Sequence, residues 1–320
     1  VAVAACADGV AAEVTVVVCE REAMRAVTAG RDGKLHVWDL TAGACLASLA
    51  GHRSSVKCVC ADFGRSRLLS ADIDGLVVMW NLTSQQVVWS FSGDCSGVQC
   101  LCADFVSRRA VSFFGDGSVT CFDTSTGTPT ATSGEGPHCR ALIVVADMQA
   151  KGRNAVSGNA DGTLRCGHLL SWADGYRTMT GHRSGVCCLS VDFLSKRALS
   201  GSSDCTLRYW NLASCRCLQI FTGHESAVHS ACVDAGSDRV LSGARDGALR
   251  LWCLSTGECL MVVSAHATCV SGLCADFAQM VAVSASWDGS LRVWRLDTGE
   301  RMQIIDAGGQ ILGLAAILRE

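Results

Sequence analysis

The sequence predicts an all-β protein built from similar four-stranded antiparallel units. The first observation is a repeat of about 42 residues, in which an apolar residue follows each glycine-rich turn, at Val14, Val56, Val98, Ala141, Val186, Val228, Val270 and Leu312. The second is that short runs of β-forming residues recur at intervals of about 8–12 residues, separated by turn residues. The third is that no stretch keeps a helical spacing long enough to compete. A fixed period of this size indicates modules that bury their apolar faces against one another.

The repeat from Ser184 to Gly223 shows the predicted order of elements. The expected strands are 185–193, 196–201, 206–212 and 217–221. A turn carrying Asp204 joins the second strand to the third, which ends on Trp210, and a turn at 213–215 leads into the fourth. A single sheet of four strands leaves both faces uncovered, so the units are expected to stack.

Composition and charge exclude several classes of protein. The chain has 320 residues, of which 49% are hydrophobic and 18% charged, which is typical of a globular protein. A formal net charge of −3 gives no strong basic field, so we do not expect nucleic acid as a partner. No apolar run approaches the length of about 18 residues that a membrane span needs. The start at Val1, with no signal peptide, suggests a fragment of a longer chain.

The 21 cysteines are predicted to be small core residues. Several fall two or four residues after the apolar reference position of their repeat, so they share one face of a strand. The odd total and the missing secretion signal favour a reducing, intracellular compartment, either cytoplasmic or nuclear. The closest pairs, such as Cys58 with Cys60, have strand spacing rather than the spacing of a zinc knuckle.

Three motifs recur at fixed places in the units. Gly-His precedes the first strand at Gly51-His52, Gly181-His182 and Gly223-His224, with Ala265-His266 as a near match. An Asp, mostly followed by Gly, lies in the turn after the second strand, and Trp ends the third strand, as in Trp38-Asp39, Trp80-Asn81 and Trp210-Asn211. Over nearly its whole length the sequence therefore resembles the WD-repeat β-propeller family.

The resemblance implies a seven-bladed β-propeller of four-stranded antiparallel blades in a single domain, residues 1–320. The expected blades are residues 14–50, 55–92, 97–133, 138–180, 184–222, 226–264 and 268–305. Residues 1–13 and 306–320 are left over, and we expect them to flank the ring or to close it. Because 312–318 resembles the first strand of another unit, an eight-bladed ring completed by further sequence is the alternative.

The resemblance also implies a hydrogen-bonded set of His, Ser, Asp and Trp in each regular blade. Carried over by position, the four complete sets are His52, Ser70, Asp74 and Trp80; His182, Ser200, Asp204 and Trp210; His224, Ser242, Asp246 and Trp252; and His266, Ser284, Asp288 and Trp294. The physical reason is that a buried indole N–H needs an acceptor and a buried carboxylate needs donors. We expect these residues to be structural.

Three blades depart from this pattern. The first has Val10 in place of His, the third has Asp94 for His and Phe122 for Trp, and the fourth has Pro137 for His and Gly167 for Trp. The stretch 124–172 also holds both prolines and the irregular repeat lengths. We interpret it as tolerated drift, with a specialised surface as the alternative.

The sequence contains no motif for catalysis, cofactor or metal binding, so we predict a protein that is not an enzyme and has neither cofactor nor metal. His224 to His229 reads His-Glu-Ser-Ala-Val-His, which is one residue too long for a metalloprotease helix. No nucleophile elbow, phosphate loop or dinucleotide fingerprint is present. Arg208, Arg250 and Arg292 alternate with inward apolar residues and are expected on a solvated face.

The variable turn residues are the candidates for binding. The turn after Gly-His and the turn that holds the Asp are expected on one rim, which is the usual partner site of the resembled family. Trp and Arg are enriched in binding hot spots, so we single out Trp287, Arg245, Arg31, Arg53 and Arg183. The predicted function is a non-catalytic scaffold that binds other proteins or peptides through this rim and assembles a complex. Alternatives are the recognition part of a larger signalling or ubiquitin-ligase adaptor, a propeller enzyme, or a nucleic-acid-associated propeller.

Overall fold

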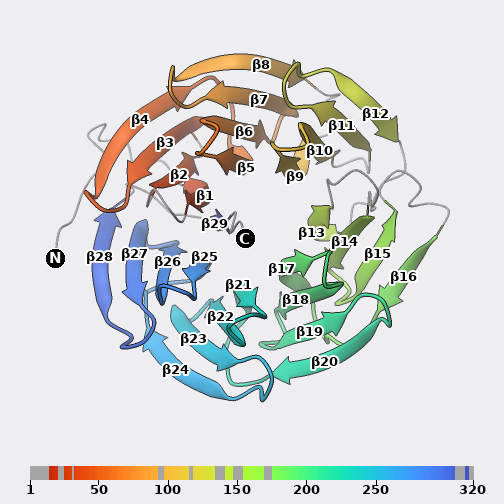
Figure 1. The fold of residues 1–320 in the computed structure, drawn as a ribbon, viewed down its shortest axis with the longest axis vertical. Coiled ribbons are helices and arrows are strands. Elements are labelled where there is room, and N and C mark those ends of the chain that lie inside the picture. Colours follow the sequence, from red (N-terminus) through yellow and green to blue (C-terminus); the bar gives the residue numbers. More distant parts are fainter. Residues whose placement is uncertain are drawn as a thin grey trace.

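Seven blades, each of four antiparallel strands, surround a common axis (Figure 1). The computed structural model describes residues 14–20, 25–30, 32–92, 97–114, 118–133, 141–146, 154–168, 175–306 and 314–316. In every blade the first strand lies nearest the axis and the fourth forms the outer edge (Figure 1). The predicted all-β, seven-bladed propeller is therefore confirmed.

The first four blades are each formed by four consecutive strands. They are β1 (Val14–Glu20), β2 (Arg25–Gly30), β3 (Lys34–Asp39) and β4 (Ala44–Ala50); β5 (Val56–Asp62), β6 (Arg67–Asp72), β7 (Leu76–Asn81) and β8 (Gln86–Ser92); β9 (Val98–Asp104), β10 (Arg109–Phe114), β11 (Val119–Asp123) and β12 (Pro129–Ser133); and β13 (Ala141–Ala146), β14 (Asn154–Asn159), β15 (Leu164–His168) and β16 (Tyr176–Met179). One of the two prolines, Pro129, begins an outer strand, where an unpaired edge tolerates a residue without an N–H.

The last three blades repeat the same order with greater regularity. They are β17 (Val186–Asp192), β18 (Arg197–Ser202), β19 (Leu207–Asn211) and β20 (Arg216–Phe221); β21 (Val228–Asp234), β22 (Arg239–Ala244), β23 (Ala248–Cys253) and β24 (Cys259–Ser264); and β25 (Val270–Asp276), β26 (Val281–Ser286), β27 (Ser290–Arg295) and β28 (Arg301–Asp306). A last short strand, β29 (Leu314–Ala316), lies beside β1 on the inner side of the ring (Figure 1).

The apolar core lies between blades rather than within them. One cluster joins Val27 and Leu35 of blade one to Val56 and Trp80 of blade two. Each sheet thus covers one face with the preceding blade and the other with the following blade, as the repeat predicts. Outer strands also bond to the next blade: the Trp89 indole N–H donates to the Thr124 carbonyl at 3.0 Å.

The junction between blades seven and one differs from the other six. Strand β29 pairs in parallel with β1 (Val17 opposite Leu314) and with β25 (Gly272 opposite Leu314). It thereby joins both blades into one nine-stranded sheet. The C-terminal piece therefore contributes an extra innermost strand between the two blades, and residues 1–13 lie outside the described part of the chain.

The first strand of every blade carries a β-bulge at its second residue. Bulges turn a side chain away from the regular alternation and occur at barrel rims and beside binding sites. The bulged residues differ in chemistry from blade to blade and are Thr15, Lys57, Gln99, Leu142, Cys187, His229 and Ser271. The fold therefore places one variable residue per blade at the start of the strand nearest the axis.

The cysteines are spread over the core and the strand faces. Among the described cysteines, the buried Cys166, Cys188 and Cys232 carry free thiols. Cys166, Cys188, Cys232, Cys269 and Cys274 are buried, whereas Cys58, Cys60, Cys100 and Cys102 are half-buried and Cys45 and Cys259 are exposed. Burial raises the pKa of the Cys188 and Cys60 thiols to about 12, so these two are protonated and unreactive at neutral pH. The prediction of core cysteines holds for only part of the set.

Candidate functional site

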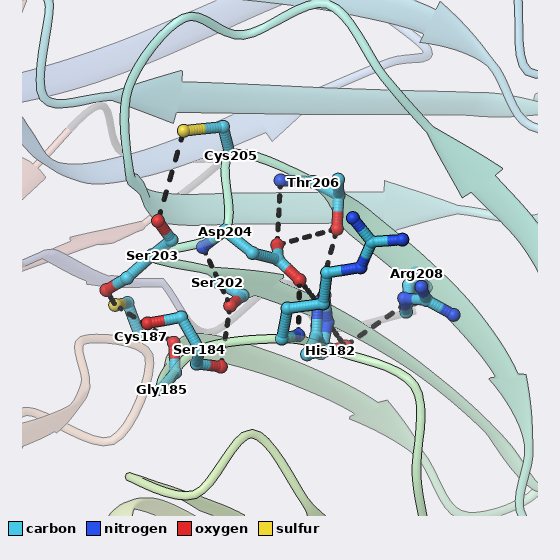
Figure 2. Close-up of polar contacts among 12 residues, drawn as sticks. His182, Ser184, Gly185, Cys187, Ser202, Ser203, Asp204, Cys205, Thr206 and Arg208 are labelled. Carbon is cyan, nitrogen blue, oxygen red and sulfur yellow. Dashed lines mark hydrogen bonds and ion pairs between the residues drawn. The ribbon is translucent and has the colours of Figure 1, made fainter.

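In blades two, five, six and seven, where both predicted turns are described, the turns lie side by side and form one rim of the ring. In the turn after the second strand, one backbone N–H donates to the residue just before the first strand. Ser203 donates to the Gly185 carbonyl at 2.9 Å, Arg245 to Ala227 at 2.9 Å, and Trp287 to Cys269 at 3.1 Å. Figure 2 shows this contact region in blade five, where residues 202–206 lie against residues 182–187. The rim is thus a set of paired turns held by the backbone.

The polar network of blade five supports this rim from below. The Trp210 indole N–H donates to Ser200 Oγ at 2.8 Å, and Ser200 Oγ lies 2.8 Å from His182 Nε2. His182 Nδ1 lies 2.9 Å from Asp204 Oδ2, which also accepts the Arg183 N–H at 2.9 Å. One carboxylate therefore ties the Gly-His turn to the Asp turn (Figure 2).

The protonation of this network fixes the direction of its hydrogen bonds. Burial lowers the pKa of His182, and the carboxylate of Asp204 only partly opposes this, so the imidazole is neutral. Burial alone would raise the pKa of Asp204, but hydrogen bonds from Arg183, Thr206 and His182 lower it to about 2. The indole thus donates to the serine, the serine to Nε2, and Nδ1–H to an ionised carboxylate.

Blade seven repeats this arrangement, and blade two varies it. In blade seven His266 Nδ1 lies 3.0 Å from Asp288 Oδ2, and Ser284 Oγ bridges His266 Nε2 (2.7 Å) to the Trp294 indole (2.8 Å). A further hydroxyl, Ser290 Oγ, contacts both His266 Nδ1 at 3.2 Å and Asp288 Oδ1 at 2.6 Å. Thr206 makes the same two contacts in blade five. The sequence analysis missed this second hydroxyl.

In blade two the expected carboxylate, Asp74, is the wrong residue. His52 Nδ1 donates instead to Asp72 Oδ2 at 2.9 Å, while Ser70 Oγ links His52 Nε2 (2.6 Å) and the Trp80 indole (2.8 Å) as expected. Asp72 is buried at the end of β6, and its Oδ1 accepts the N–H groups of Asp74 and Leu76. Asp74 is left exposed on the rim. The turn holds two aspartates, so its sequence offered both choices.

In blade six the expected set is incomplete. Ser242 Oγ bridges His224 Nε2 (2.7 Å) and the Trp252 indole (2.8 Å), but Asp246 turns outward and His224 Nδ1 finds no partner among the described residues. Two hydroxyls are missing, because Ala244 and Ala248 occupy the positions of Ser202 and Thr206 in blade five. The Asp246 N–H bonds to Ser226 Oγ instead. Burial, with the charge of Arg250, lowers the pKa of His224 to about 4.

The remaining blades keep fragments of the network. In blade one the Trp38 indole donates to Thr28 Oγ1 at 2.9 Å. In blades three and four the hydroxyls of Ser112 and Ser157 are fully buried and have no partner in the described structure. The positions of Val10, Asp94 and Pro137 lie outside the described residues.

The predicted binding residues occupy different depths of the rim. Arg53, Arg183 and Arg245 are exposed, whereas Trp287 is half-buried. Arg31 lies outside the described residues. The structure adds His229, the bulged residue of β21, whose ring centroid lies 6.0 Å from that of Trp287. Sequence reasoning considered His229 only as a metal ligand, and the signal that could have found it is its variable position after the apolar reference residue.

The arginines near the strand ends do not form a basic band. The guanidinium groups of Arg208 and Arg250 lie 6.0 Å from the ring centroids of Trp210 and Trp252. Arg292 Nη2 pairs with Asp288 at 3.3 Å. These three residues are half-buried, so they are less exposed than the expected solvated face.

Two kinds of feature are absent from the described part of the chain. Within these residues no group of three or more His, Cys, Asp or Glu side chains could hold a metal ion. Across the same residues no helix is long and apolar enough to cross a membrane.

Comparison with known proteins identifies the family. Residues 43–81, 175–211, 215–253 and 257–295 match the family model described as "WD domain, G-beta repeat". The solved structure of the computationally designed Ika8 protein is similar, with a TM-score of 0.72 and 24% identity, over 97% of this chain and 92% of that chain. No curated protein matches the sequence. The chain belongs to the WD40-repeat family, and its likeness to the designed protein concerns the fold alone.

Proposed function

We propose that this propeller is a non-catalytic scaffold that binds other proteins or peptides through the rim of paired turns. The observation that carries the proposal is a rigid frame with variable, exposed turn residues. Backbone bonds and the His-Ser-Trp networks hold the turns, while the exposed side chains differ between blades, as Ile73, Ser203 and Arg245 show at one equivalent position. Binding residues are commonly placed on loops that a rigid scaffold positions.

The charges of the rim favour a protein partner over nucleic acid. Exposed Arg53, Arg183 and Arg245 share the rim with exposed Asp74 and Asp246. A nucleic acid would need a continuous basic face, whereas mixed charges beside apolar groups such as Ile73, which is 51% exposed, are typical of protein recognition.

The test is affinity capture with the intact chain, followed by measurement of the dissociation constant of the captured partner. We expect Trp287→Ala and Arg245→Ala each to weaken binding by at least about tenfold, since such residues dominate interface energies. Arg216→Ala is the matched control, because Arg216 is exposed at the start of β20, on the opposite rim. Unchanged binding by folded rim variants, checked by melting temperature, would exclude this rim as the site.

A further inference from the structure

The Trp287 side chain contains an unused hydrogen-bond donor. Its Nε1 atom is buried and has no acceptor among the residues that the structure describes. The indoles that end the third strand of blades one, two, five, six and seven all donate to a Ser or Thr hydroxyl. A buried donor without an acceptor is unfavourable, because it has lost its hydrogen bonds to water. A ligand that supplies an acceptor would remove this cost.

One nitrogen-bearing side chain lies beside this indole, and a second occupies the equivalent turn position of the neighbouring blade. The imidazole of His229 contacts the Trp287 ring from the bulge of β21, and the guanidinium of Arg245 comes from the turn of the same blade. Burial lowers the pKa of His229, and the charge of Arg245 lowers it further. Arg245 also acts on the buried thiol of Cys269, whose carbonyl accepts the Trp287 backbone N–H.

The charge of Arg245 is available to a ligand. No ion pair joins Arg245 to a carboxylate within the described residues, although Asp246 follows it in the turn. Asp246 Oδ1 accepts the N–H of Ala248 at 2.9 Å, so this carboxylate is held by its own turn. The guanidinium remains exposed at the rim.

We propose that Arg245, Trp287 and His229 form an oxyanion subsite of the rim, which accepts a carboxylate or phosphate side chain of a partner peptide. The inference rests on the proposed function and names the chemistry of one contact within it. A guanidinium and an indole N–H supply charge-assisted and neutral hydrogen bonds to the oxygens, and the exposed arginine can attract the anion first. Because Nε1 is covered in the free protein, the indole must turn for the oxygen to reach it.

That rotation gives the proposal a direct signal. In protein labelled with ¹⁵N-tryptophan, the Trp287 indole resonance is assigned as the one lost in Trp287→Phe, which keeps a ring but removes the donor. The probes are blocked tripeptides with a central glutamate, phosphoserine or glutamine. We expect the glutamate or phosphoserine peptide, but not the glutamine peptide, to shift this resonance. Arg245→Gln should weaken the binding by about tenfold, and Arg216→Gln should leave it unchanged.

The comparison of the two anionic peptides decides between a carboxylate and a phosphate as the natural group. The proposal is overturned if neither peptide moves the Trp287 resonance, or if Arg245→Gln binds both as well as the parent protein. These outcomes are independent of partner capture. If rim variants lose the captured partner but neither anionic peptide binds, only the oxyanion subsite is rejected. If an anionic peptide binds but rim variants still capture the partner, the proposed function is rejected.

Discussion

Whether a repeated serine stabilises its blade depends on the hydrogen-bond partners of its hydroxyl group. The serine of a network stabilises the fold only where its hydrogen-bond partners are present. Ser70 accepts from the Trp80 indole and bonds to His52. Blade three has Phe122 at the position of Trp80, so the indole that would donate to Ser112 is missing. The same residue type at the same repeat position therefore has opposite energetic value, because a buried hydroxyl is stabilising only when paired.

This difference predicts opposite effects of the same substitution. Ser70→Ala should lower the free energy of unfolding by about 1–3 kcal/mol, because it leaves the Trp80 indole and the His52 imidazole without a partner. Ser112→Ala and Ser157→Ala should change it by less than about 0.5 kcal/mol or raise it, since their hydroxyls have no partner among the described residues. Urea unfolding of the three variants measures this. Equal losses at all three positions would show that the buried hydroxyls of blades three and four are paired.

The residues of the networks were predictable in kind but not in detail. The indoles and serines follow from strand position, since register alone brings Leu68 opposite Trp80 and Ser70 opposite Val78. Strand position does not predict the carboxylates. The turn of blade two contains both Asp72 and Asp74, and the one that binds His52 is the one whose carboxylate accepts the backbone N–H groups of the turn. Asp246 fails for a similar reason, since two missing hydroxyls outside the motif release it.

The turn between the second and third strands is the element in which blade five departs from the others. Five blades have glycine in the left-handed conformation at this turn, at Gly33, Gly75, Gly162, Gly247 and Gly289. Blade five has Cys205 there, with φ 67°. A Cβ at Gly33 or Gly162 would lie 2.7 Å or 2.8 Å from the carbonyl oxygen of His52 or His182 in the next blade. Such contacts are too short, so a side chain here displaces the following Gly-His turn.

The Gly-His turn that leads into blade six differs in conformation from its equivalents. Gly223, which precedes His224, has φ 146°, whereas the equivalent Gly51 and Gly181 do not have positive φ. His224 is also the one histidine of the four sets without a carboxylate on Nδ1 in the described structure.

Replacing this residue should strengthen the fold. Cys205→Gly is expected to raise the free energy of unfolding by about 1 kcal/mol, because glycine adopts the left-handed region without the penalty of a side chain. Gly162→Ala is the matched control and should destabilise, since its Cβ would meet the His182 carbonyl. Chemical unfolding of both variants is the measurement. A loss of stability in Cys205→Gly would mean that its side chain packs usefully against the next blade.

At the scale of the whole molecule, the buried histidines make stability depend on pH. Burial lowers the pKa of His52, His182, His224 and His266, that of His224 from its ordinary value of 6.5 to about 4. Between these values the unfolded chain binds more protons than the folded one, so stability falls as the pH is lowered from 6.5 towards 4. His224 alone contributes up to about 3 kcal/mol to this loss.

The slope of this loss can be changed by one hydroxyl. Ala248→Ser places a hydroxyl where Ser290 holds both Asp288 and His266 in blade seven. It should bring Asp246 towards His224, raise the pKa of the imidazole and flatten the decline in stability between pH 6.5 and about 4. Unfolding midpoints across this pH range test it. Equal slopes for the variant and the parent protein would show that His224 stays without the carboxylate.

The sequence predicted the ring better than its closure. The repeat, the turn motifs and the strand runs were enough for seven blades, because every unit has the same local chemistry. Strand β29 could only be placed loosely, since a short apolar run such as Leu314–Ala316 carries no mark of the two strands it pairs with. The Trp287 and His229 contact was also beyond the sequence, because it joins different blades.

Strand β29 makes one of the seven equivalent junctions unlike the rest. The backbone crosses the other six, whereas blades seven and one are joined there by hydrogen bonds through three residues, Leu314–Ala316. A circular permutant that links blade seven covalently to blade one and is cut between two other blades would carry the same seven sheets. In the permutant, the junction that opens first would be the one without a covalent link. The place where the ring first opens is therefore set by chain connectivity rather than by the blades themselves.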